Sequence, residues 1–101
     1  MNDELAPYTH FIQDETGYCF WDDEPGKIPF IYSLFVKPEH RNKGSARNLL
    51  TYIINKIYSK YGNTKIYIEP NPTEKDIDKE RLTNFYKSLG LTIIKIEKIE
   101  V

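Results

Sequence analysis

The stretch from residue 29 to residue 61 constrains the fold of this chain more than any other part of the sequence. Residues 29–37 (PFIYSLFVK) are almost all apolar or aromatic, which is typical of a strand with both faces covered. Pro38 ends this strand, and residues 45–61 then repeat apolar side chains at spacings of three and four, as on one face of a helix. The short alternating strand 65–69 (KIYIE) follows. A strand, a helix and a second strand in this order predict a βαβ unit and therefore a partly parallel sheet.

Two short strands are expected before this unit. Residues 10–13 and 18–22 carry the strand-forming side chains, and residues 14–17 (DETG) between them favour a turn. A second turn at residues 24–27 (EPGK) then leads into the apolar strand. The chain is therefore predicted to open with a β-hairpin.

A loop, a helix and a strand are expected after the unit. Residues 70–75 contain two prolines and read as a loop. Asp76 or Asp78 is expected to cap a second helix that runs to Leu89. Residues 91–101 form a terminal strand region. The predicted order of hairpin, strand, helix, strand, helix and strand places the fold in the α/β class with a mixed sheet.

Length and composition exclude several kinds of protein. The 101 residues fit one domain that spans residues 1–101. Fourteen Lys and Arg oppose fifteen Asp and Glu, and the net charge of −1 argues against a specific nucleic-acid binder. We expect a cytoplasmic protein without membrane contacts, because no apolar stretch can span a bilayer and the acidic N-terminus is unlike a signal peptide. The single cysteine, Cys19, reads as a small buried residue, and no Cys or His spacing indicates a metal site.

The loop between the apolar strand and the first helix carries the clearest chemical signal. Its residues 40–46 (HRNKGSA) lead directly into a helix whose first amides have no internal partner and whose dipole makes that end partly positive. A diphosphate placed there can accept several backbone hydrogen bonds. Gly44 permits a turn with either sign of φ. Arg41, Lys43 and Arg47 add positive charge. The same residues also fit an ordinary turn with solvated basic side chains.

Two motifs in this order resemble those of the GNAT N-acetyltransferases. The first consists of Arg41, two residues, Gly44, one residue and Ala46, between an apolar strand and an amphipathic helix. It is similar to the acetyl-CoA motif of that family, which is Arg or Gln, two residues, Gly, one residue, and Gly or Ala. The second is the segment 84–91 (NFYKSLGL), which is similar to the family's aromatic or aliphatic residue and tyrosine followed by a glycine and an apolar strand. The resemblance covers residues 30–91.

The resemblance implies a GNAT-like fold with a site for acetyl-CoA as co-substrate. In the family, the strand before the loop parts from its parallel neighbour, and the pantetheine arm lies in the gap. By position, it would pair there with backbone groups of Leu34, Phe35 and Val36. The loop and the start of the helix would hold the pyrophosphate. The residues implied for pyrophosphate binding are Arg41, Asn42, Lys43, Gly44, Ser45, Ala46 and Arg47.

The resemblance also implies direct transfer of the acetyl group to a primary amine, with Tyr86 as the general acid for the leaving thiolate. A phenol with a pKa near ~10 keeps its proton at neutral pH and can donate it. The attacking amine needs a base, and the first candidate is Glu69 at the end of strand 65–69. Asp22, Asp23 and Glu24 come next, followed by His40. A chain of water molecules is the alternative.

Two departures from the family pattern leave the acceptor open. Only about twenty-eight residues precede the central strand, so the usual first strand and the two helices that often form the acceptor site are largely missing. Lys79 stands where many relatives have an asparagine that contacts pantetheine. The same short plan is similar to small bacteriophage acetyltransferases, which makes a protein lysine or N-terminus a candidate acceptor. A homodimer would fit so short a chain, although nothing in the sequence requires it.

Three kinds of function therefore stay open. The first is an acyl-CoA-dependent N-acetyltransferase. The second is a GNAT-like module that binds CoA, has weak or no catalytic activity and acts through protein contacts, which the missing acceptor region favours. The third is a small interaction protein without a ligand.

Overall fold

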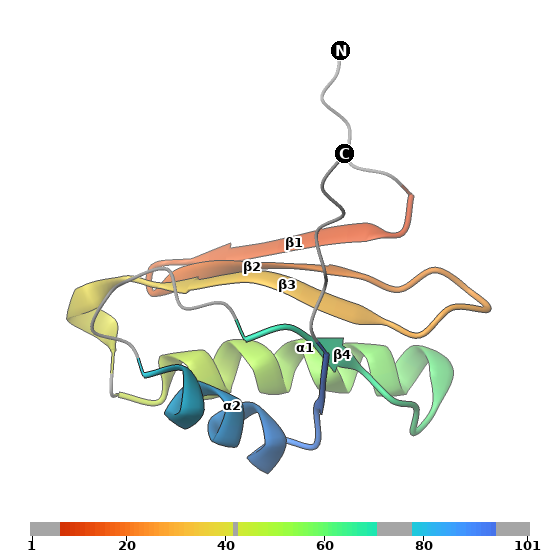
Figure 1. Cartoon of the computed structure of the whole chain (residues 1–101). Coiled ribbons are helices and arrows are strands. Elements are labelled where there is room, and N and C mark those ends of the chain that lie inside the picture. The colour runs from red at the N-terminus through yellow and green to blue at the C-terminus, as the bar shows by residue number, and fades with distance from the viewer. Residues whose placement is uncertain (1–6, 42, 71–77, 95–101) are drawn as a thin grey trace, which may run out of the picture.

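The computed structural model describes residues 7–41, 43–70 and 78–94 of the chain (Figure 1). The elements are β1 (Thr9–Asp14), β2 (Gly17–Asp22), β3 (Phe30–Val36), the short 3-10 helix η1 (Pro38–His40), α1 (Ser45–Tyr61), β4 (Tyr67–Ile68), α2 (Lys79–Ser88) and β5 (Thr92–Ile93). Their order is the predicted one, and the α/β class with an N-terminal hairpin is confirmed. Neither α-helix in this described part is long and apolar enough to cross a membrane.

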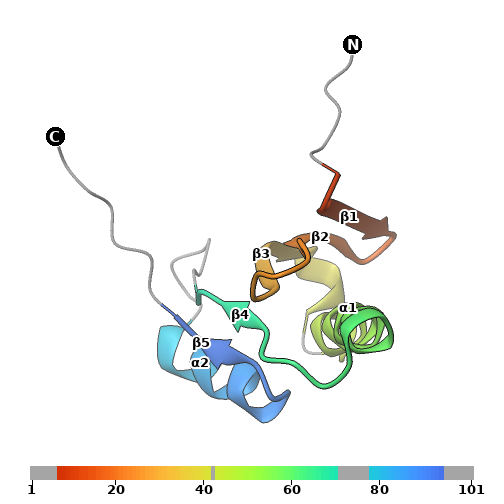
Figure 2. The ribbon, with the colours of Figure 1, turned by 90° about the vertical axis from the view of Figure 1, so that its right-hand side faces the viewer.

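The strands form one sheet in the order β1–β2–β3–β4–β5. β1, β2 and β3 are antiparallel neighbours, whereas β3, β4 and β5 run parallel and are joined by the crossover helices α1 and α2. Right-handed crossovers that progress in one direction along a sheet place their helices on the same face. Figure 2 shows α1 and α2 on one side of the sheet, and neither helix covers the other face of β1, β2 and β3.

The core lies between the sheet and these two helices. α1 contributes the fully buried Leu50, Ile53 and Ile57, as its apolar periodicity predicts. Ile31 of β3 and Tyr86 of α2 belong to the same buried cluster. Each fully buried isoleucine contributes about 1.5–3 kcal/mol relative to an exposed one. The apolar face of α1 therefore holds the parallel part of the sheet in place.

Both helices begin where the sequence indicates. The ends of α1 are marked by Gly44 and Gly62, each with a φ of 82°. Asp78 caps α2, because its carboxylate accepts a hydrogen bond of 2.9 Å from the Glu80 amide. The alternative cap, Asp76, lies outside the described residues. α2 ends at Ser88, one residue before the predicted end.

The two C-terminal strands are shorter than predicted. β4 comprises two residues instead of residues 65–69, because its pairing with β3 stops after Ile31 and Ile68. The described part of the terminal strand region is β5, which spans Thr92–Ile93. Residues 95–101 of the predicted region lie outside the described residues. The length of β4 is thus set by its neighbour in the sheet.

A β-bulge in β3 interrupts the pairing of β2 with β3. Tyr18 pairs with Phe35 and Phe20 with Tyr32, so Cys19 alone lies opposite two residues of β3. Gly17 sits beside this bulge. A Cβ atom at Gly17 would lie 2.0 Å from the Phe35 carbonyl oxygen, a distance that real Cβ atoms do not show. The bulged end of β3 therefore depends on the absence of a side chain at position 17.

Substitution of Gly17 tests this close approach. Gly17→Ala is expected to lower the free energy of unfolding by about 1–3 kcal/mol, because the Phe35–Val36 backbone must move, and Gly17→Ser to lower it further. Gly26 is the control, since its φ is 83° and a Cβ atom at this position would meet no atom within 4 Å. There Asn, which tolerates positive φ, should be milder than Ala. Urea denaturation measures the free energy of unfolding of all four variants. The steric explanation would be contradicted if the larger side chain were the milder substitution at Gly17, as it is expected to be at Gly26.

Candidate functional site

A gap opens between the two central parallel strands. Phe30 pairs with Tyr67 and Ile31 with Ile68, and the pairing of β3 with β4 ends there. β3 continues to Val36, held on its other side by β2. Because β3 and β4 are parallel, the gap lies at their carboxyl ends, where ligands bind in open α/β sheets. The predicted residues Leu34, Phe35 and Val36 lie on this unpaired stretch of β3.

The first turn of α1 lies after this stretch of β3 in the chain and forms a site suited to an anion. Gly44 adopts the left-handed conformation and its carbonyl accepts the first helical hydrogen bond, 2.9 Å long, from the Asn48 amide. Ser45 is buried, Ala46 is half-buried, and Lys43 is exposed. No acidic side chain lies in this turn, so nothing there opposes a negative ligand. Asn42, also predicted for this site, lies outside the described residues.

Arg41 turns back onto the end of β3. Its Nε donates a 2.9 Å hydrogen bond to the Val36 carbonyl, and its guanidinium carbon lies 5.7 Å from the centre of the Phe35 ring. Arg41, which was predicted to add positive charge around the anion, therefore also contacts the end of β3. Its side chain also fixes the start of the loop against the strand, and it occupies one acceptor position of Val36, a residue predicted to bind ligand through its backbone.

Arg47 links the first turn of α1 to α2. Its guanidinium carbon lies 5.3 Å from the centre of the Phe85 ring, within the range of a cation–π contact. Phe85 directly precedes Tyr86 in α2. The contact thus connects the anion-binding end of α1 to the helix that carries the predicted acid. Sequence reasoning placed Arg47 in the site but did not identify this partner.

Tyr86 points into the core and is 4% exposed. Burial raises the pKa of its phenol to about 12, with a smaller contribution from the nearby Cys19. Cys19 is fully buried on β2, opposite the bulge of β3, and burial raises the pKa of its thiol to about 12 as well. The environment around Tyr86 therefore disfavours negative charge on either a phenol or a thiol.

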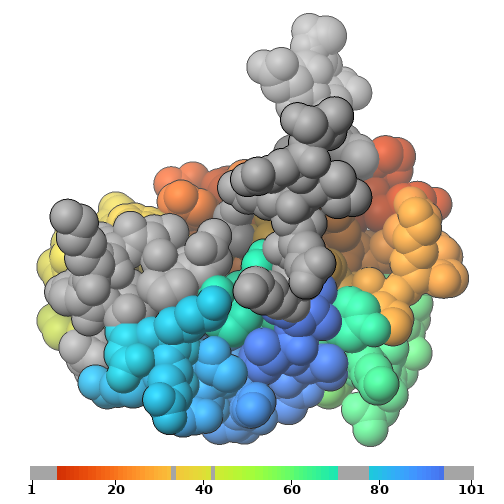
Figure 3. Space-filling view, viewed as in Figure 1, coloured from red at the N-terminus to blue at the C-terminus, as the bar shows by residue number. Residues whose placement is uncertain are grey.

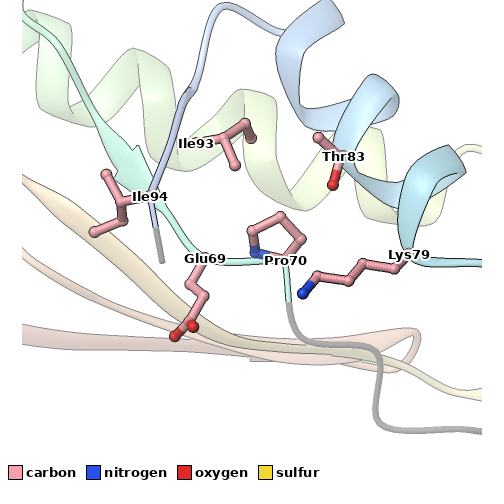
Figure 4. A pocket seen from close by; sticks show the side chains of 6 residues that line it. All are labelled: Glu69, Pro70, Lys79, Thr83, Ile93 and Ile94. Carbon is pink, nitrogen blue, oxygen red and sulfur yellow. The ribbon is translucent and has the colours of Figure 1, made fainter. Parts of the chain in front are cut away.

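Glu69 follows β4 and lines a cavity of about 280 Å³ between β4, α2 and β5. The cavity is also lined by Pro70, Lys79, Thr83, Ile93 and Ile94. In Figure 4 the ring of Pro70 lies between the side chains of Glu69 and Lys79. Glu69 directly follows Ile68, the last residue of β4 that pairs with β3, and Lys79, which departs from the family pattern, lines the same cavity as Glu69.

The other predicted bases lie elsewhere. Asp23 is buried at the opposite end of α1, where its carboxylate contacts His10 Nε2 at 2.7 Å and Lys60 Nζ at 3.6 Å. The length of α1, about 24 Å, separates this cluster from the first turn. Glu24 follows it and pairs with Lys27 at 3.0 Å. Asp22 accepts a long hydrogen bond of 3.5 Å from the Tyr32 hydroxyl, and His40 ends η1 on the loop side.

Comparisons with known proteins bear on this site. Residues 7–91 match the acetyltransferase (GNAT) family profile. No curated protein sequence matches the chain. Three solved structures share the fold at low sequence identity. One is a ribosomal-protein-alanine N-acetyltransferase from Brucella melitensis biovar Abortus 2308, with 14% identity, a TM-score of 0.61, and coverage of 93% of this chain and 70% of that chain.

The second solved structure is an aminoglycoside acetyltransferase from an uncultured soil metagenomic sample, with 17% identity, a TM-score of 0.61, and coverage of 95% of this chain and 66% of that chain. The third is an integron cassette protein from the mobile metagenome of V. cholerae, with 19% identity, a TM-score of 0.57, and coverage of 85% and 54%. The chain thus spans between about half and about two thirds of the length of these proteins. At these sequence identities, the similarity shows a shared fold.

Gly44 and Gly62, at opposite ends of α1, provide a test of the anion site. Both have a φ of 82° and a Cβ at either meets no atom within 4 Å, but ψ is 5° at Gly44 and −165° at Gly62. Gly44→Glu should cost about 1–2 kcal/mol of backbone strain, and Gly62→Glu should cost more, because its φ and ψ lie in a region that is essentially restricted to glycine. Only Gly44→Glu places a negative charge beside the first-turn amides, so it alone should weaken acetyl-CoA binding, by at least about tenfold. Isothermal titration calorimetry measures both, and equal affinities would remove the anion site from this loop.

Proposed function

The chain belongs to the GNAT acetyltransferase family, and we propose that it transfers the acetyl group of acetyl-CoA to a primary amine. The observation that carries this proposal is the gap between β3 and β4 beyond Ile31 and Ile68. The gap ends in a helix N-terminus without acidic side chains, and α2 brings a protonated phenol to the same core. An extended arm, an anion and a proton donor therefore have places in one connected region.

The described residues fit acetyl-CoA. The free edge of β3 at Leu34 and Phe35 offers backbone groups to an extended arm, as a strand edge does to an added strand. The first-turn amides of α1, with Ser45 and the cations Lys43 and Arg47, suit the pyrophosphate. We assign the backbone at Ala46 to the same task. A helix terminus alone contributes about 0.3–1 kcal/mol per exposed charge, so the amides, cations and arm must act together.

The transfer itself is a direct displacement. The nitrogen of a neutral amine attacks the thioester carbonyl carbon and forms the C–N bond. The C–S bond breaks, and its electron pair leaves on sulfur. We assign Tyr86 as the donor whose phenolic proton neutralises the thiolate, while a base takes the surplus proton from nitrogen. No metal or redox step is needed to balance this reaction.

Burial matches Tyr86 to its leaving group. In water a thiol with a pKa near ~8.5 would be a poor acceptor for a proton from a phenol with a pKa of about 12. The buried thiol of Cys19 nearby, however, has its own pKa raised to about 12 by desolvation. Desolvation of a CoA thiol next to Tyr86 would raise its pKa by the same cause, and would make proton transfer from Tyr86 less unfavourable than in water.

We assign Glu69 as the base, because it directly follows Ile68, where the pairing of β4 with β3 ends and the gap begins. Asp23 and Glu24 are assigned no catalytic role, since Asp23 belongs to the cluster at the far end of α1. The acceptor is proposed to be a protein lysine or N-terminus. The short chain, which spans 66% of one acetyltransferase of the same fold, keeps a second function open: a module that binds CoA and acts through protein contacts.

Tyr86→Phe tests the acid. We expect kcat to fall by about 10²–10⁴, while the affinity for acetyl-CoA stays within about threefold, because the lost proton matters only when the thiolate forms. Tyr58→Phe is the control, since Tyr58 packs against the same core from α1. Steady-state kinetics and calorimetry on both variants measure the effect. An unchanged kcat in Tyr86→Phe would remove Tyr86 from the acid role.

The pH dependence tests both proton-transfer residues. Because the pKa of Tyr86 is about 12, the phenol should stay protonated and give no falling limb of kcat/KM below about pH 11. Glu69→Gln should lower kcat/KM at pH 7 by at least about tenfold. The deficit should shrink toward pH 10, where a lysine amine with a pKa near ~10.4 is increasingly neutral and needs no base. A deficit that is constant with pH would contradict the base role.

A further inference from the structure

Aromatic side chains cover the face of the sheet that the two helices leave open. The inner residues of β2 are buried, so Tyr18 and Phe20 point the other way, together with their cross-strand neighbours. We define the outer aromatic face by Phe11, Tyr18, Phe20, Phe30, Tyr32 and Phe35. Figures 1 and 2 show α1 and α2 on the opposite side, and in Figure 3 the β1–β2 hairpin lies at the top of the view and α2 at the bottom.

These rings form one continuous row across three strands. Phe11 and Phe20 lie 4.6 Å apart between ring centres, and Phe20 and Tyr32 lie 5.9 Å apart. Phe11 is 42% exposed, and the other rings are half-buried by one another. A contiguous apolar patch of this kind on a soluble domain marks an interaction site.

The charges beside the row differ between its two ends. The Arg41 guanidinium carbon lies 5.7 Å from the centre of the Phe35 ring, whereas the end at Tyr32 carries a carboxylate. Among the outward positions of β2, Asp22 is the charged one, and it touches the Tyr32 hydroxyl at 3.5 Å. Glu69 follows the last residue of β4, and in Figure 4 its carboxylate points away from Lys79 and Thr83 of α2. Aromatic faces and carboxylates together attract a cation, because the ring quadrupole and the negative charge act in the same direction. The end of the face at Tyr32 and Asp22 is thus complementary to a positively charged group of a partner.

The row ends at the gap between β3 and β4. Phe30 lies opposite Tyr67 in the sheet, and Tyr32 and Glu69 each lie two residues further along the chain. Tyr32 and Glu69 therefore flank the start of the gap from either side. A cation that binds the outer aromatic face is held next to the proposed thioester site.

We propose that the outer aromatic face docks the acceptor, and that the acceptor is an extended, lysine-bearing segment of a polypeptide. This inference rests on the proposed acetyl transfer and adds the acceptor's class and place. The distance from β1 to β4 across the strands is about 14 Å. That is the length of about four extended residues, and longer than a lysine side chain alone. The row therefore has room to contact residues next to the lysine that reaches the gap.

The test compares a peptide with an amine that lacks a backbone. The probes are an N-terminally blocked peptide with one central lysine flanked by arginines, and n-butylamine. With the wild-type chain, kcat/KM should be at least about tenfold higher for the peptide. Phe20→Gln should raise the KM for the peptide about tenfold and leave the KM for n-butylamine and the affinity for acetyl-CoA unchanged. Asp22→Asn, which preserves shape, should raise the peptide KM several-fold.

Tyr52→Gln is the matched control, because Tyr52 is a 47% exposed aromatic residue on α1. It should change nothing, and acetyl-CoA affinity confirms that each variant is folded. An unchanged peptide KM in both Phe20→Gln and Asp22→Asn overturns the inference alone, since the wild type still acetylates an amine. The inference is also overturned if sedimentation shows a dimer that Phe20→Gln dissociates while the peptide KM stays unchanged. Acetyl-CoA binding without acetylation of either amine overturns the proposed function, and this inference with it.

Discussion

The separation of β3 from β4 is the constraint on which the rest of the site depends. Strand pairing satisfies backbone groups, so ending it after Ile31 and Ile68 leaves a free edge on β3 that water or a ligand must satisfy. The bulge opposite Cys19 and the side-chain-free Gly17 hold β3 on the β2 side. Arg41 then fixes the end of the strand through the Val36 carbonyl. The gap is thus shaped by contacts of β3 with β2 and with Arg41 of the following loop.

The sequence predicted the elements whose signals are local. The bounds of α1 follow from an apolar face that ends at Gly44 and Gly62, and the start of α2 follows from the cap at Asp78. It did not predict the length of β4 or the need for glycine at position 17. Both depend on how β3 is displaced by its neighbours, and that displacement leaves no periodic signal in the chain.

The candidate site likewise contains residues that local motifs predict and residues whose surroundings depend on distant parts of the chain. The anion loop and Tyr86 were predicted because short motifs carry them, and the structure places them at one end of α1 and in one core. Asp23 was a predicted base but belongs to a cluster with His10 and Lys60 that its sequence neighbours do not reveal. The raised pKa values of Tyr86 and Cys19 likewise arise from burial between elements distant in sequence. The sequence therefore predicted which residues to consider for the site, whereas the surroundings of those residues came from the structure.

The two faces of the sheet present opposite conditions to an amine. Outside, Asp22 and Glu69 favour the charged ammonium, which attracts an acceptor but keeps it unreactive. Inside, the surroundings that raise the pKa of Tyr86 to about 12 disfavour charge of either sign. On the proposed mechanism, an amine that moves from the outer face into the gap would lose solvation, and its pKa would fall. Glu69, which follows the last paired residue of β4, would then accept the proton as the nitrogen becomes a nucleophile. The proposed site thus separates binding of the charged amine from its activation.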